Sequence, residues 1–459
     1  MNIKDSFVKY IEEAIGHENA LVAFSAFEEP ASTAVRYNPS KPCGMMEGRH
    51  VPWAEHGYIL PERPVFTLDP LFHAGAYYVQ DSSSMFVGHA FRKMLSEIQL
   101  PQGRPLRVLD LCAAPGGKTT DLAASLREVL GGQFLLVANE VMKARVGILA
   151  DNVALWGDPN VVVTCDDPAA FGALPVFFDI IVTDVPCSGE GMFRKDEEAV
   201  QQWSEDNVSL CEARQRRILA DVWPSLKEGG ALVYSTCTFN RRENDGNVEW
   251  ISSELGARML TADDMLGGMP GVIKTDRGYS LVPGHVEGEG QYCAILQKTS
   301  DVVMNDAPVR SRKALRQAKP TPVPDGLQRL LNIPAVFRTK GDTITAVPEN
   351  IASDVNRVEE SLHVVAAGCA VGVVKGKDLV PDADLALSMM LADDAYPAVE
   401  LDRKEALAFL HRDAQVFPES PRGYLLIKHE GLSLGFVKNL GNRSNSLHPQ
   451  SRRIRMDIK

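Results

Sequence analysis

The chain has 459 residues, of which 45 % are hydrophobic and 24 % are charged, and its formal net charge is −12. This is a globular composition with room for two or three domains. It contains no apolar run of about 18 residues, which argues against a membrane-spanning helix, and the acidic N-terminal segment is unlike a signal peptide. The negative net charge argues mildly against a nucleic-acid binder, except where basic residues gather locally.

The first 100 residues mix helical and irregular patterns. Residues 1–16 have helical spacing, with Phe7, Tyr10, Ile11 and Ile15 on one face. We therefore predict an N-terminal α+β subdomain over residues 1–100.

Residues 106–298 alternate apolar strands with amphipathic helices. This alternation predicts a Rossmann-like domain over residues 101–300, with a mostly parallel sheet covered on both faces. The expected strands are 107–112, 134–139, 160–165, 178–183, 230–236 and 291–297, and the expected helices include 121–130, 144–157 and 206–226.

The remaining chain divides into a linker and a small domain. Residues 301–326 are basic and rich in proline at their end, so we predict an extended linker. Residues 327–459 have short apolar runs broken by Gly and Asp, which predicts a β-rich domain. Its last segment holds a basic cluster, a candidate RNA contact or a solvated tail, made up of Lys438, Arg443, Arg452, Arg453, Arg455 and Lys459.

A glycine-rich turn follows the first expected strand, with the sequence Ala113-Ala114-Pro115-Gly116-Gly117-Lys118. Such a turn lets the backbone and a helix N-terminus approach a ligand closely. The spacings of the ATP-binding P-loop and of G-x-G-x-x-G are both absent.

Acidic residues follow the neighbouring strands: Glu140, Asp166 and Asp184. A carboxylate at the position of Glu140 can accept both ribose hydroxyls of an adenosine, and Asp166 could face an adenine amino group. The alternatives are ordinary solvation of Glu140 and helix capping by Asp166.

The chain has eight cysteines and no C-x-x-C pair, so we expect neither a disulfide framework nor a metal site. Free cysteines suit a reducing cytoplasm, where we expect the protein to act. Cys187 follows a proline at a strand exit, and Cys237 ends a strand in the segment STCTF. A lone cysteine is usually a small buried hydrophobe, but two of them beside a cofactor turn suggest nucleophilic chemistry.

These motifs carry a family resemblance. The segments PGGKT, DVPCSGEGMFRKD and YSTCTFNRRENDGNVEW occur in the order found in RNA cytosine-5 methyltransferases of the Nol/Nop/Sun superfamily, which the chain resembles. The resemblance implies that Cys237 is the nucleophile, Cys187 assists product release and Asp184 protonates N3 of the base. It also implies S-adenosylmethionine as cofactor, with contacts from Cys112, Ala113, Ala114, Pro115, Gly116, Gly117, Lys118, Glu140, Asp166 and Asp184. The role of Lys118 stays open between orienting the turn, approaching a phosphate and packing.

Two C-terminal segments are LHVVAAGCAVGVVKGKDLVPDADLALSM and GYLLIKHEGLSLGFVKNLGNRSNSLHPQSRRIR. They resemble the PUA-like RNA-binding tail of bacterial 16S ribosomal RNA methyltransferases of the F type. The resemblance implies methylation of carbon 5 of cytosine in ribosomal RNA or the small subunit by a monomer without membrane partners. It also implies an RNA-binding role for residues 1–100 and for Arg443, Arg452, Arg453 and Arg455.

Three alternatives remain at this point: the same reaction on transfer RNA, DNA methylation, and a non-catalytic RNA-binding ribosome assembly factor.

Overall fold

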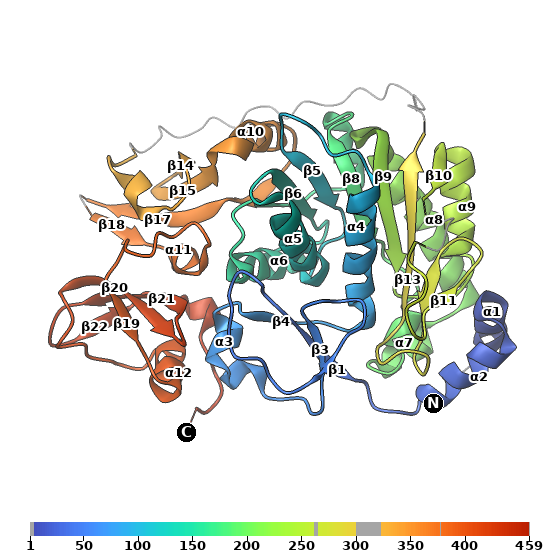
Figure 1. Cartoon of the computed structure of the whole chain (residues 1–459), viewed down its shortest axis with the longest axis horizontal. Helices are drawn as coiled ribbons and strands as arrows, with labels where there is room; N and C mark the ends of the chain where they lie inside the picture. The colour runs from blue at the N-terminus through green and yellow to red at the C-terminus, as the bar shows by residue number, and fades with distance from the viewer. Residues whose placement is uncertain (1–3, 261–264, 300–322, 377, 459) are drawn as a thin grey trace.

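The computed structural model describes residues 4–260, 265–299, 323–376 and 378–458. These residues form one ten-stranded central sheet and three four-stranded sheets (Figure 1). Most of the predicted linker, residues 301–322, lies outside the described residues. Within the described ranges, we find no helix with the length and apolarity that a membrane span requires.

The central sheet has the order β11-β12-β13-β9-β8-β5-β6-β7-β16. Its parallel strands are β5 (Leu106–Asp110), β6 (Phe134–Asn139), β7 (Val161–Thr164), β8 (Phe178–Asp184) and β9 (Leu226–Thr236). Antiparallel strands extend it: β10 (Ala257–Met259), β11 (Ile273–Lys274), β12 (Tyr279–Leu281), β13 (Gln291–Lys298) and β16 (Val364–Ala367). The chain runs from β5 outward to β7 and then returns to β8 on the other side. Ligands bind at such a switch point, beyond the carboxyl ends of the strands.

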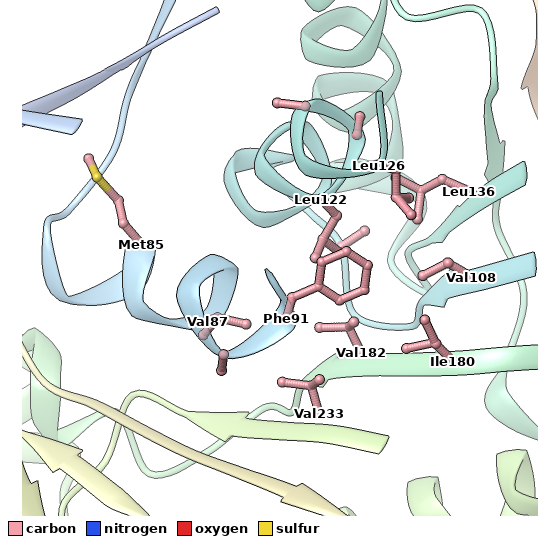
Figure 2. Packing of buried hydrophobic residues seen from close by; sticks show 14 of the residues in the cluster. Met85, Val87, Phe91, Val108, Leu122, Leu126, Leu136, Ile180, Val182 and Val233 are labelled. Atoms are coloured by element: carbon pink, nitrogen blue, oxygen red, sulfur yellow. The ribbon is translucent and has the colours of Figure 1, made fainter. Parts of the chain in front are cut away.

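Both faces of the parallel strands are buried, and alternate residues belong to different cores. Val108 and Val182 face α4 (Phe86–Glu97), α5 (Gly117–Leu130) and α6 (Lys143–Trp156). Figure 2 shows this core, in which Phe91 of α4 and Leu122 of α5 lie over the strands. Leu109 faces the opposite layer, which contains α8 (Glu205–Val222), α9 (Asp245–Glu254) and α10 (Ala352–Ser361). The predicted Rossmann-like fold is confirmed.

The N-terminal unit combines a helical pair with a small sheet. Helices α1 (Asp5–Ile15) and α2 (His17–Ala26) form the pair, and α1 buries Phe7, Ile11 and Ile15 as the spacing predicts. The sheet has the order β2-β3-β1-β4. Its elements, with a short helix, are β1 (Thr33–Tyr37), β2 (Arg49–His50), β3 (Gly57–Leu60), α3 (Pro70–His73) and β4 (Tyr77–Val79). Helix α4 falls within the predicted range 1–100 but packs on the central sheet.

The C-terminal unit has two sheets and also reaches into the central domain. The sheets are β14-β15-β17-β18 and β19-β20-β21-β22. Their elements, with two short helices, are β14 (Ala335–Lys340), β15 (Thr343–Pro348), β17 (Cys369–Lys375), β18 (Asp378–Pro381), α11 (Ala383–Leu387), β19 (Ala398–Glu400), α12 (Arg403–His411), β20 (Gly423–His429), β21 (Leu432–Asn439) and β22 (Ser444–Ser446). Strand β16 pairs with β7, and Arg107 makes an ion pair of 2.7 Å with Asp354 of α10. Residues 345–367 are therefore an integral part of the central fold.

Local chemistry explains where two helices depart from their predicted bounds. Helix α5 begins at Gly117, earlier than expected, because Gly116 takes a left-handed conformation (φ 115°) that other residues rarely adopt. Helix α8 ends at Val222, before its expected end, because Pro224 cannot continue the hydrogen-bond ladder.

Candidate active site

The strand ends β5 to β9 bring the two thiols and the glycine-rich turn together. Cys187 Sγ lies 3.2 Å from Cys237 Sγ, close enough for one thiol to donate a hydrogen bond to the other. All eight cysteines lie in described segments and are free thiols. The hydrogen bond to Cys237, together with burial, raises the pKa of Cys187 well above its ordinary value.

Asp184 ends β8 and forms an ion pair with Lys118, with 2.9 Å between Nζ and Oδ2. The other carboxylate oxygen accepts hydrogen bonds from Ser235 and Gln291. Burial alone would raise the pKa of Asp184, but Lys118 and these donors outweigh it and lower the pKa. Burial would likewise lower the pKa of Lys118, but Asp184 and Cys237 raise it. At neutral pH the pair's proton therefore resides on Lys118, and Asp184 is ionised.

Two buried carboxylates tie the two cysteine loops to each other. Glu190, from the Cys187 loop, accepts from the backbone N–H of Phe239 (2.7 Å) and Asn240 (3.0 Å) and from Trp203 Nε1 (2.8 Å). Glu243 accepts from the backbone N–H of Ser188 (3.0 Å) and from the Asn240 amide (2.8 Å). Burial and the adjacent Glu190 carboxylate raise the pKa of Glu243 to about 7.

A close backbone approach completes the junction of the cysteine loops. The Gly191 N–H donates to the Cys237 carbonyl at 2.8 Å, and a Cβ at Gly191 would lie 2.7 Å from that oxygen. Only glycine fits this approach. Phe239 packs with Phe27 of the N-terminal unit, so the helical pair supports this loop through apolar contact.

The glycine-rich turn is held from two sides. The Ala113 N–H donates to the Asn139 carbonyl, and the carbonyls of Ala114 and Pro115 accept from Arg145 and Asn152 of α6. Arg36 of β1 donates to the Gly117 carbonyl (3.1 Å) and to Thr120 Oγ1 (2.6 Å). Cys112 sits where the turn begins, and burial raises its pKa to about 12.

The acidic residues beside the turn have different surroundings. Glu140 is buried; its Oε1 accepts from the Met142 N–H, and Arg145 lies 3.5 Å from its Oε2. Asp166 Oδ2 accepts from the backbone N–H of His363, which directly precedes β16. Asp110 is buried at the end of β5, and its Oδ1 has no hydrogen-bond partner among the described residues. Burial raises the pKa of Asp110 to about 7.

The turn, the carboxylates and the start of α5 fit a cofactor with an adenosine and an amino-acid part. Backbone N–H groups and Lys118 offer donors, while Glu140 and Asp110 offer acceptors with free capacity. No group of three His, Cys, Asp or Glu side chains that could hold a metal occurs in the described part of the chain.

The arginines predicted to contact RNA fall into two groups. Arg443 and Arg455 are exposed. Arg452 is mostly buried and pairs with Asp151 of α6 (2.9 Å) and Asp384 of α11 (2.7 Å). Arg453 is half-buried and its Nη2 lies 3.4 Å from His411. Arg452 thus joins the C-terminal unit to α6, and only Arg443 and Arg455 are open to a ligand.

Sequence reasoning did not identify Arg36, Glu190, Glu243 or His363 as site residues. Glu190 and Glu243 lie inside the two cysteine motifs, so their proximity to the thiols was available as a signal. Arg36 and His363 reach the site only through tertiary packing, and no local pattern marks them.

The central sheet and the two thiols beside a glycine-rich turn define a Rossmann-like methyltransferase. Models of three families match the chain: 16S rRNA methyltransferase RsmB/F over residues 99–297, the N-terminal domain of 16S rRNA methyltransferase RsmF over 3–82, and the methyltransferase RsmF PUA domain over 396–454.

Curated relatives agree with these models. Ribosomal RNA small subunit methyltransferase F of Shewanella loihica is 32 % identical over 415 residues, which cover 86 % of this chain and 82 % of that protein. The protein of the same name from Salmonella agona is 29 % identical over 97 % of this chain and 95 % of its own length. The chain therefore belongs to the 16S ribosomal RNA methyltransferase F family, whose members are enzymes that methylate ribosomal RNA with S-adenosylmethionine.

Solved structures share the fold. A methyltransferase homolog from Pyrococcus horikoshii is 27 % identical with a TM-score of 0.53, covering 65 % of this chain and 96 % of that one. NSun6 from Pyrococcus horikoshii, solved with SFG, is 18 % identical with a TM-score of 0.52, covering 65 % of this chain and 99 % of that one.

Proposed function

We propose that this enzyme methylates carbon 5 of cytosine in 16S ribosomal RNA through a covalent bond between Cys237 and carbon 6. The observation that supports the proposal most strongly is the 3.2 Å contact between two thiols, beside the Lys118–Asp184 pair and next to the cofactor turn. Carbon 5 of cytosine is a weak nucleophile, and a thiolate that adds to carbon 6 makes it enamine-like.

In this scheme, side chains of the site assist the addition and the release of the base. The Cys237 thiolate forms a bond to carbon 6, and N3 takes a proton from Lys118 through Asp184. The cofactor, when bound, would supply to carbon 5 a methyl group that is activated by a positively charged sulfur. The carbon 5 proton then passes to solvent, the carbon 6–sulfur bond breaks, and N3 returns its proton to Asp184.

Cys187 assists the last step in this scheme. Its S–H can donate a hydrogen bond to the departing Cys237 thiolate, as the Sγ–Sγ distance in the free enzyme allows. Stabilising the thiolate makes it a better leaving group. The proposed cofactor contacts are the turn 112–118 with Glu140, Asp166 and Asp184, and Glu140 is the acceptor for the ribose hydroxyls.

The C-terminal arginines divide into two proposed roles. Arg443 and Arg455 contact RNA phosphates, while Arg452 and Arg453 hold the C-terminal unit in place. The enzyme acts as a monomer in the cytoplasm in this proposal.

Nucleoside mass spectrometry and bisulfite sequencing of 16S ribosomal RNA test the function. RNA incubated with the enzyme and S-adenosylmethionine should gain 5-methylcytosine at defined positions. A methyl group found only on another base, on a ribose or on transfer RNA would refute the proposal. Incubation with the Cys43→Ala variant, which changes a thiol remote from the site motifs, should give the wild-type result.

A further inference from the structure

A groove lies between the N-terminal sheet and helix α6. Its volume is about 620 Å³, within the range of small-ligand pockets. Figure 1 shows α3, β4 and α6 meeting at this place. Five aromatic residues are among those that line it: the buried Phe66, Tyr77 and Trp156, and the half-buried Phe72 and Tyr78.

The groove opens beside the cofactor turn. Asn152, in its wall, donates to the Pro115 carbonyl at 2.8 Å. Tyr78 packs against the start of α5, where a Cβ at Gly117 would lie 3.2 Å from its ring. A ligand in the groove therefore lies against the outer side of the turn whose inner side faces the site.

The chemistry of the walls suits a nucleobase. Aromatic faces stack on any base, and the rings of Phe72 and Tyr78 are partly exposed. The exposed Arg63 lies over the Phe66 ring at 5.5 Å. The buried Trp156 Nε1 has no hydrogen-bond partner among the described residues. Val65, at the rim, is 55 % exposed. An aromatic cluster that served only packing would fill its own volume and satisfy its polar atoms.

The groove also leads from one flanking unit to the other. It shares Asn152 and Leu155 with a second cavity of about 270 Å³, which extends to His448 and Arg452 of the C-terminal unit. An RNA strand that contacts both the N-terminal and the C-terminal units has a continuous path along this face of α6.

We propose that the aromatic groove binds one unstacked base of the ribosomal RNA, near the methylated nucleotide, and that Arg63 contacts its phosphate. The proposal requires ribosomal RNA as the substrate but does not depend on cytosine-5 chemistry. Its tests measure the KM for RNA and the site of RNA cross-linking, and neither depends on which base is methylated. They can therefore fail while cytosine methylation stands, and the cross-linking can succeed where cytosine methylation fails.

Steady-state kinetics with 16S ribosomal RNA test the groove through the Phe72→Ala and Arg63→Glu variants. We expect the KM for RNA to rise about tenfold in each, as the loss of one stacked base or one phosphate contact predicts. The kcat at saturating RNA and the affinity for S-adenosylmethionine should stay at wild-type values. The control is Trp250→Ala, which removes an aromatic wall from a different groove between α8 and α9.

Several outcomes would overturn the proposal. One is an unchanged KM for RNA in Arg63→Glu, because this exposed side chain can be replaced without disturbing folding. Another is a rise in the KM for RNA in Trp250→Ala equal to that in the groove variants. If Phe72→Ala bound S-adenosylmethionine more weakly than the wild type, Phe72 would have a structural role. A KM change seen with assembled subunits but not with naked RNA would identify the occupant as a ribosomal protein. Cross-linking of 4-thiouridine-substituted RNA should label peptides within residues 63–79. Labelling confined to other segments would contradict the proposal that the groove binds a base.

Discussion

The polar contacts that join the Cys187 and Cys237 loops come from residues 184–292, whereas those that hold the glycine-rich turn and Asp166 come partly from outside the central domain. Glu190 and Glu243 join the two thiol loops. On the other side, Arg36 of the N-terminal unit supports the turn, and His363 of the C-terminal unit engages Asp166. The two thiol loops are thus tied together by polar groups of the methyltransferase domain itself, while the proposed cofactor site also has polar contacts with both flanking units.

The largest test of this difference is truncation. Deleting 327–459 removes α10 and β16, and with them Val347, Ile351, Val355, Val358 and Leu362 from the core. Burial of each contributes about 1.5–3 kcal/mol, so together they match the whole stability of an ordinary domain. We expect this fragment to lose its cooperative thermal transition, whereas deleting only 396–459 should preserve it. A 1–326 fragment that melts and binds S-adenosylmethionine like the full chain would contradict this account.

A smaller effect is expected from Glu190→Gln, which should disturb the thiol loops and leave cofactor binding unchanged. In Glu190→Gln, an amide NH₂ replaces one carboxylate oxygen and opposes N–H donors that now point at it. We expect kcat to fall about 100-fold, because a displacement of about 1 Å at the thiols can cost that much. The dissociation constant of S-adenosylmethionine, measured by calorimetry, should not change. Equal losses in kcat and in cofactor affinity would mean that the two sides are not independent.

The reciprocal variant is Arg36→Met, which removes the hydrogen bonds to Gly117 and Thr120. We expect the dissociation constant of S-adenosylmethionine to rise about tenfold, because two charge-assisted hydrogen bonds no longer hold the turn. The kcat at saturating cofactor should stay near the wild-type value. Unchanged cofactor affinity in a folded variant would remove the N-terminal unit from the cofactor site.

The smallest effect is a pH dependence from Glu243. Its carboxyl releases its proton near pH 4.5 in the unfolded chain and near pH 7 in the folded protein. Between these values the folded protein binds more protons, so the free energy of unfolding falls as pH rises and becomes level above pH 7. The total is at most about 3 kcal/mol.

Glu243→Gln lacks this contribution, while shifted groups such as Asp110 and His89 are common to both proteins and cancel in the comparison. The Tm of the wild type relative to the variant should therefore be several degrees higher at pH 5 than at pH 8. A constant difference between the two proteins across this range would show that Glu243 is not buried as the structure places it.

The sequence predicted the central sheet and the two thiols because both leave local signals. Apolar strands such as 134–139 and the cysteine motifs can be read without knowledge of tertiary contacts. The insertion of β16 beside β7 could not be predicted, since residues 364–367 look like any short strand and their partner is remote in sequence. Arg452 was likewise grouped with a basic tail, and only the fold reveals its partners Asp151 and Asp384.

The role of Asp184 shows a further limit of the sequence. A motif can place a carboxyl group at a strand end, but it does not give the group's protonation state. That state depends on Lys118, Ser235 and Gln291, which come from three other elements. The structure shows that Lys118, whose role the sequence left open, is the ion-pair partner of Asp184, and our proposal makes it the source of the proton.

The measurement that tests the division of labour between the thiols most directly is a denaturing gel with labelled 16S ribosomal RNA. After incubation with S-adenosylmethionine, Cys187→Ala should give a slow-migrating protein–RNA band, because the Cys237 thiolate leaves the methylated base poorly without its hydrogen-bond donor. Cys237→Ala should give neither band nor methylation, and Cys43→Ala should behave as wild type. A band in Cys237→Ala and none in Cys187→Ala would reverse the two roles, and full activity in both variants would contradict the covalent mechanism.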